Sequence, residues 1–123
     1  MPITDIGIVS VPVTDQDRAV AFYAGVLGFD VINDSPMGPD MRWVQLAPPG
    51  ATTTITLVTW LEKLKPGSCS LLLNTDDLDG DIVKFRAVGV DIGDVAEEFW
   101  GRYVMFEDPD GNGIILRGAP SSR

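Results

Sequence analysis

The residue types that carry acid–base, nucleophilic or metal chemistry are scarce in this chain. Among its 123 residues there is no histidine and only one cysteine, Cys69. Without histidine, the serines lack the base that usually activates a serine nucleophile. No pair of carboxylates falls in the interior of the predicted strands, so general acid–base catalysis also lacks obvious participants. Three tryptophans, two tyrosines and a set of hydroxyl and amide side chains remain, and these are suited to binding.

Two stretches of sequence contain the elements that would position these side chains. In the first, Val11 and Val13 alternate with other residue types as in a strand, Thr14 or Asp15 can cap a helix, and Gly28 can end it. Apolar residues at helical spacing lie between the cap and the glycine. The same order of features returns in the second half of the chain.

The second stretch is an internal repeat of the first. Asp15, Asp17, Val20, Tyr23 and Val26 correspond, at an offset of 62, to Asp77, Asp79, Ile82, Phe85 and Val88. Further on, residues 42–44 match residues 102–104 at an offset of 60. A slowly shrinking offset is typical of a duplicated module with small loop deletions. We therefore predict two modules, residues 1–61 and 68–118, joined by a short linker.

Each module is predicted to contain a strand, a helix and then three strands. The expected strands are residues 6–13, 29–33, 41–47 and 52–60 in the first module, and 68–74, 90–95, 102–107 and 114–117 in the second. The second helix is expected over residues 78–88, and residues 34–39 are expected to form a loop because they contain two prolines and a glycine. The sequence thus predicts an α+β fold of two tandem βαβββ modules.

The composition favours one soluble domain that binds neither nucleic acid nor membranes. Apolar residues make up 45% of the chain, and the formal net charge is −9. Such a surface repels nucleic acid and anionic lipid, and it could help to attract a cationic ligand. No apolar run approaches the ~18 residues of a membrane span, and no signal-peptide pattern is present at the N-terminus. We therefore expect a cytoplasmic protein, which agrees with a lone cysteine that cannot form an internal disulfide.

Three motifs give the chain a specific resemblance to a known superfamily. They are V-x-V-x-D-x-x-x-A-x-x-F-Y-x-x-V-L-G-F over residues 11–29, W-G-R-Y at 100–103 and F-x-D-P-D-G-N-x-I-x-L at 106–116. Together they resemble the vicinal oxygen chelate superfamily, which includes glyoxalase I, extradiol dioxygenases, fosfomycin resistance proteins and bleomycin-binding proteins. The resemblance covers about residues 3–118 and implies one domain with a U-shaped mixed sheet around a small-molecule cavity. It also implies a homodimer, often with the modules arranged across the two chains.

The resemblance implies a divalent metal as well, but the matching positions carry unsuitable side chains. Enzymes of the superfamily usually hold the metal with His, Glu or Gln on the first and last strands of each module. The matching positions here are Ile8, Thr56, Ser70 and Ile115. Isoleucine has no donor atom, and a neutral hydroxyl is a poor ligand for zinc, nickel, iron or manganese. We therefore expect neither a metal nor another cofactor.

The strand face that the resemblance turns towards the cavity carries the candidate ligand-binding residues. They are Ile8, Trp43, Gln45, Thr56, Trp60, Ser70, Tyr103, Met105, Ile115 and Arg117, together with Trp100, which matches a W-G at the cavity mouth of relatives. Aromatic and apolar walls with a few polar groups are typical of pockets for drug-sized molecules. Two alternatives remain open: Trp43 and Trp60 could fill the U as core residues, and Arg117 could be exposed at a strand end.

Two hypotheses about function follow. The first is a metal-free protein of the bleomycin-resistance type that binds a drug or an aromatic metabolite. The second is a lyase, isomerase or dioxygenase of the glyoxalase type with a non-standard or absent metal site, for which Gln45 and Glu107 are the remaining candidate residues.

Overall fold

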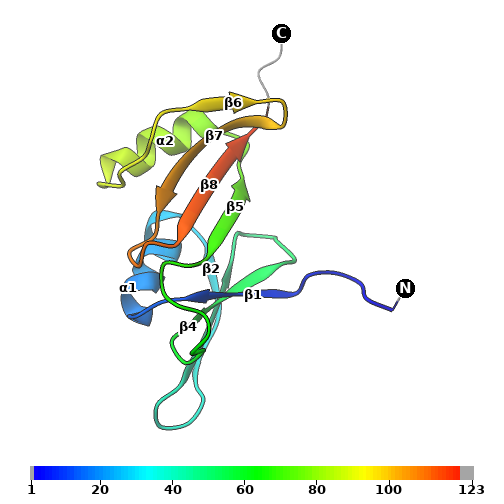
Figure 1. Cartoon of the computed structure of the whole chain (residues 1–123), viewed down its shortest axis with the longest axis vertical. Coiled ribbons are helices and arrows are strands. Elements are labelled where there is room, and N and C mark those ends of the chain that lie inside the picture. The colour runs from blue at the N-terminus through cyan, green and yellow to red at the C-terminus, as the bar shows by residue number, and fades with distance from the viewer. Residues whose placement is uncertain (1, 120–123) are drawn as a thin grey trace.

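The computed structural model describes residues 2–119 and contains two four-stranded sheets (Figure 1). The first sheet has the order β1-β4-β3-β2, with bounds Ile8–Pro12, Thr54–Val58, Arg42–Ala47 and Asp30–Pro36. The second has the order β5-β8-β7-β6, with bounds Ser70–Asn74, Gly113–Gly118, Gly101–Glu107 and Ala96–Glu98. In each module the first strand in chain order pairs in parallel with the fourth, β1 with β4 and β5 with β8. The other strand pairs are antiparallel. The predicted α+β fold of two tandem βαβββ modules is confirmed.

Both helices begin at an aspartate cap and end near a glycine, as the repeat predicts. Asp15 accepts a hydrogen bond from the backbone N–H of Arg18 at the start of α1 (Gln16–Val20), and Asp77 accepts one from Gly80 at the start of α2 (Leu78–Ala87). Gly28 and Gly89 have φ values of 85° and 95°, a left-handed conformation that costs glycine little.

The first helix differs from the expected single α-helix. After α1 the chain continues as a π-helix, η1 (Ala21–Val26), and the N–H of Leu27 donates to the carbonyl of Phe22, five residues earlier. Phe22 and Tyr23 are adjacent in sequence, yet both side chains are buried. Both rings lie within the π-helical segment and contact each other edge to face, with centroids 5.2 Å apart.

The repeat extends to equivalent ion pairs. Arg42 on β3 contacts Asp17 at 2.7 Å, and Arg102 on β7 contacts Asp79 at 3.1 Å. Each pair joins the first turn of a module's helix to the third strand of the same module. These residues occupy corresponding positions of the two repeats, so the duplication is preserved in three dimensions.

Two predicted element boundaries are wrong. Residues 90–95 form no strand; instead Ile92 is buried, its carbonyl accepts from the Arg86 guanidinium, and the pairing strand is β6, further along the chain. Residues 34–36 lie in β2 rather than in a loop, where they pair with β3. The proline at the end of β2 is tolerated because β2 is an edge strand.

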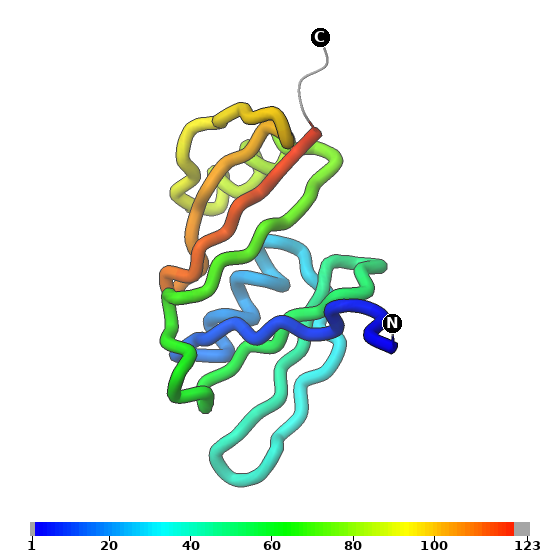
Figure 2. Tube along the Cα trace, turned by 45° about the vertical axis from the view of Figure 1, so that its right-hand side comes forward, coloured from blue at the N-terminus to red at the C-terminus, as the bar shows by residue number. Residues whose placement is uncertain are grey.

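One core lies between the two sheets and the helices. It includes alternate residues of the strands, among them Val11, Val44, Leu57, Val104 and Leu116. The rings of Phe22 and Phe106, one from each module, lie 6.4 Å apart between centroids. The edge strands β1 and β5 diverge from the place where the modules meet (Figure 2). Each sheet therefore turns its other face away from this shared core.

The turn between β7 and β8 joins the modules through buried polar groups. Asn112 is fully buried, and its amide N–H donates to the carbonyl of Pro12 at 2.8 Å and to Asp108 at 2.9 Å. Its oxygen accepts from the backbone N–H groups of Gly67 and Cys69. The Tyr23 hydroxyl donates to Asp108 at 2.8 Å. The residues from Asp108 to Asn112 are called the clamp turn below.

The clamp turn also anchors the first helix. The Asp110 carboxylate accepts from the backbone N–H and the hydroxyl of Thr14, and it forms an ion pair with Arg18 at 3.1 Å. These residues are more than 90 positions apart in sequence. The relative position of the modules is therefore fixed by hydrogen bonds and not by the linker alone.

Replacing Asn112 with alanine should destabilise the protein by about 3 kcal/mol, because it removes the partner of the buried Pro12 carbonyl and of two part-buried N–H groups. The free energy of unfolding is measured by urea denaturation. Asn33→Ala, at an exposed position of β2, is the matched control and should cost less than about 0.5 kcal/mol. Equal effects of the two variants would show that the clamp turn contributes little to stability.

Candidate binding faces

The outer face of the first sheet carries a chain of polar side chains beside a tryptophan. Trp43 donates its indole N–H to the oxygen of Gln45 at 3.1 Å, and Gln45 donates its amide N–H to the Thr54 hydroxyl at 2.9 Å. Strand register places Ser10, Gln45 and Thr56 side by side. We call the outward-pointing residues of this sheet the first face: Ile8, Ser10, Trp43, Gln45, Thr54 and Thr56.

The outer face of the second sheet carries an aromatic stack with an arginine above it. The rings of Trp100 and Tyr103 are 4.7 Å apart between centroids and inclined by 21°. The guanidinium carbon of Arg117 lies 5.9 Å from the centroid of the Trp100 ring. Its Nε donates to the Asn74 side-chain oxygen at 2.9 Å. The second face consists of Leu72, Asn74, Trp100, Tyr103, Met105, Ile115 and Arg117.

The predicted binding residues therefore fall into two groups instead of one. Ile8, Trp43, Gln45 and Thr56 belong to the first face, and Trp100, Tyr103, Met105, Ile115 and Arg117 belong to the second. Ser70 is exposed at the start of β5, beside Gly113, and Trp60 is half-buried two residues beyond β4. Thr56 is only 1% exposed, so it lies beneath the surface of its face. Thr54 was missed, although strict alternation from Thr56 would have placed it on the same face.

Both faces are open in a single chain. Apolar side chains on them remain in contact with solvent: Ile8 is 47% exposed, Leu72 45% and Met105 57%. The alternate residues of the same strands are buried in the core. Apolar side chains left exposed on a sheet face can be covered by a ligand or a partner.

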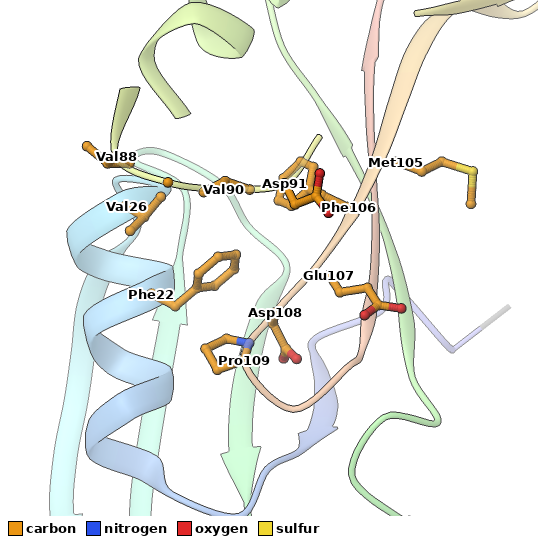
Figure 3. Close-up of a pocket in the computed structure, with 11 residues that line it drawn as sticks. Phe22, Val26, Val88, Val90, Asp91, Met105, Phe106, Glu107, Asp108 and Pro109 are labelled. Carbon is orange, nitrogen blue, oxygen red and sulfur yellow. The ribbon is translucent and has the colours of Figure 1, made fainter. Parts of the chain in front are cut away.

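The largest hollow of the described residues lies elsewhere, on the helix side of the second sheet. It has a volume of about 570 Å³ and lies between η1, the connection from α2 to β6, and β7. Phe22, Val26 and Val90 contribute to its walls, whereas Met105 and Glu107 point away from them (Figure 3). Met105 is the only predicted binding residue in its lining. Among residues 2–119, the aromatic side chains of the two faces line none of the three largest hollows.

Two groups in the interior have ionisation shifted by burial. The pKa of Tyr23 is raised above its usual range by burial and by the neighbouring carboxylate of Asp108. Burial also raises the pKa of the Cys69 thiol, and its sulfur lies 3.9 Å from the carbonyl oxygen of Ser10. A thiol whose pKa is raised is a poor nucleophile at neutral pH. Cys69 therefore has the properties of a structural cysteine.

The side chains present do not fit the divalent metal of the resembling enzymes. Within residues 2–119, no group of three or more Cys, Asp or Glu side chains could hold a metal ion. Ile8 and Thr56 lie on one sheet and Ser70 and Ile115 on the other, and these side chains offer no carboxylate, imidazole or thiolate.

No helix within residues 2–119 has the length and apolar character needed to cross a bilayer.

Comparison with known proteins supports the architecture and the kind of site. The profile of the Glyoxalase/Bleomycin resistance protein/Dioxygenase superfamily matches residues 5–116. The structure of TnmS3, described as an antibiotic binding protein from Streptomyces sp. CB03234, is 45% identical and superposes with a TM-score of 0.92, over 98% of this chain and 99% of that one.

Two further relatives extend the comparison. A glyoxalase/bleomycin resistance protein from Streptomyces sp. CB03234 is also 45% identical, with a TM-score of 0.83 over 92% of this chain and 99% of that one. The uncharacterised protein YetH of Bacillus subtilis (strain 168) is 37% identical over 120 residues, which is 94% of this chain and 98% of that protein. Small-molecule binding is thus represented among close structural neighbours.

Proposed function

The chain belongs to the glyoxalase/bleomycin resistance protein/dioxygenase superfamily, and on this basis we propose that it is a metal-free protein that binds a planar aromatic drug or metabolite. The observation that carries the proposal is the stack of Trp100 and Tyr103 on an open sheet face. Aromatic rings that are half-buried can each bury a large area against a planar ligand. The antibiotic-binding description of TnmS3, at 45% identity, supports the same class of function.

The proposal extends to a homodimer. Each face is one wall of a site, and a second wall is needed to bury 70% or more of a drug-sized ligand. We propose that the first face of one chain and the second face of its partner enclose the ligand. Each site would then take one wall from the first module, residues 1–61, and the other wall from the partner's second module, residues 68–118. Met1 lies outside the described residues. The exposed Ile8, Leu72 and Met105 support this arrangement because dimerisation would cover them.

The remaining features of the proposal follow from composition and from the donor set. A reducing, cytoplasmic location fits the lone Cys69, whose thiol has its pKa raised by burial. Binding without turnover fits the hydroxyl, amide and aromatic groups that predominate on both faces, since the chain has no histidine to act as a base. Metal independence fits the unsuitable side chains at the four positions that match metal ligands.

Ligand binding should be visible in tryptophan fluorescence, because the proposed site contains Trp43 and Trp100. Titration with a panel of planar compounds of different charge, including an anthracycline, an aminoacridine and an anthraquinone carboxylate, should give saturable quenching for at least one of them. Trp100→Ala should weaken that binding about tenfold or more, since a stacking surface is lost. Val83→Ala, at an exposed position of α2, is the control and leaves all three tryptophans in place. If no compound alters the fluorescence, the proposed function is contradicted.

Leu72→Glu should convert the dimer to monomers and abolish ligand binding, because it places a charge in the proposed apolar interface. Sedimentation velocity over a range of protein concentrations measures the association. Val83→Glu introduces the same charge at a residue of α2 that is 70% exposed and outside both faces, and should leave the dimer intact. A wild-type protein that binds ligand as a monomer would refute the shared site.

Divalent metals should not stabilise the protein. A ligand that binds only the folded state stabilises it by mass action and so raises the melting temperature. The free energy of unfolding increases by about 2.7 kcal/mol at a ligand concentration 100 times the Kd. We expect no saturable rise for Mn, Fe, Co, Ni or Zn with chelator-stripped protein. A rise for one metal, lost in a Gln45→Ala or Glu107→Ala variant, would favour the lyase, isomerase or dioxygenase alternative instead.

A further inference from the structure

We propose that the ligand carries an acidic group and that Arg117 on the second face recognises it. The proposal rests on the proposed function and makes it narrower: the ligand class becomes planar aromatic compounds with a carboxylate or another acidic oxygen beside the ring system. The observations that carry it concern the partners of Arg117, the way in which its side chain is held, and the aromatic surface beside it.

Arg117 forms no ion pair with an acidic residue among residues 2–119, although acidic residues outnumber basic ones by 18 to 9 in the whole sequence. Among residues 2–119, Arg18, Arg42 and Arg102 each form an ion pair with an aspartate. Arg86 donates instead to two backbone carbonyls at the end of the α2–β6 connection. Arg117 donates through Nε to the neutral amide of Asn74, and no described Asp or Glu approaches its two terminal nitrogens as an ion pair. Its hydrogen-bonding fork is therefore available to a ligand.

The Arg117 side chain is held in place by its neighbours. Asn74 fixes Nε, and the guanidinium lies over the Trp100 ring. Gly101 has a φ of 145°, and a Cβ at this position would lie 2.6 Å from the Gly118 carbonyl oxygen and 3.0 Å from Cγ of Arg117. The glycine of the W-G-R-Y motif thus leaves the space that the stem of Arg117 occupies. A guanidinium that is already positioned loses less entropy when it binds an anion.

The position of the fork relative to the aromatic rings indicates a ligand with two parts. Strand register places Tyr103, Arg117 and Asn74 in one row across β7, β8 and β5. A planar ring system can lie against the aromatic side chains while an acidic group at its edge meets the guanidinium. Arginine binds a carboxylate with two parallel N–H···O bonds. A ligand with a neutral amide or an ammonium group in place of the carboxylate cannot accept both bonds in this geometry.

This inference opposes the simple expectation from the net charge. A total charge of −9 favours cations at long range, but salt screens such effects beyond about 8 Å under physiological conditions. Contact-range interactions in a partly enclosed site are screened much less. The charge of the ligand is therefore decided by the nearest group on the face, which is Arg117.

Three compounds with the same rings and different charges test the inference. Naphthalene-2-carboxylate, 2-naphthamide and 2-naphthylmethylammonium are titrated against the wild-type protein, and their dissociation constants are measured by ligand-observed NMR. The carboxylate should bind about tenfold more tightly than the amide, and the ammonium compound most weakly. In Arg117→Gln this preference should disappear while the amide still binds.

Arg102→Gln is the matched control, because it removes the same charge from the adjacent strand outside the second face, and the preference for the carboxylate should remain. Equal affinities of the wild type for all three compounds would overturn the inference and leave the proposed function intact. Failure of all three to bind would contradict the proposed function, and the inference would fall with it. The ratio of the dissociation constants of the amide and the carboxylate for the wild-type protein tests the preference for an acidic ligand even if Arg117→Gln proves unstable.

Discussion

The buried polar contacts of the clamp turn are the constraint on which the rest of the structure depends. Where β1 ends and β5 begins, the fully buried Asn112 side chain provides partners for the buried carbonyl of Pro12 and for the part-buried N–H groups of Gly67 and Cys69. Buried backbone groups without partners are costly, so this junction forms only in one geometry. That geometry brings the helix of the first module onto the second sheet and completes the shared core.

The binding faces are a consequence of how the core is built. Each strand gives alternate residues to the shared core, where Val44, Leu57 and Val104 are fully buried. The other residues must then point outwards, and they carry the tryptophans, amides and hydroxyls. The modules share a core along one side, so their free faces do not enclose a cavity within one chain. The homodimer proposed above would pair two faces that are each incomplete.

The chemistry of the faces favours recognition over turnover. Their polar groups are amides and hydroxyls, many of them already bonded to one another, as in the chain from Trp43 through Gln45 to Thr54. Such groups orient a ligand but do not abstract protons at neutral pH. Arg117 is the charged group beside the aromatic stack, and a permanently protonated guanidinium binds anions without acting as a base. One scaffold hosts many activities, so the side chains of each member decide its function.

The sequence by itself determined the features that depend on near neighbours. The repeat, the caps Asp15 and Asp77, the left-handed Gly28 and Gly89 and the assignment of strand residues to the core all follow from local spacing, and the structure has them. The motifs identified the superfamily for the same reason. These features can be predicted from the sequence because helix capping, glycine conformation and strand alternation are properties of a few consecutive residues.

Only the tertiary structure decided the features that depend on distant partners. The π-helix arises because Phe22 and Tyr23 both pack into the core, and β6 begins late because Ile92 is needed there as a buried residue. The separation of the predicted site into two faces, and the position of Arg117 over Trp100, result from packing across the whole chain. The alternation of residues along a strand predicts which face of the sheet a side chain lies on. It does not predict which part of the molecule packs against that face. That is settled by contacts between residues as far apart as Pro12 and Asn112.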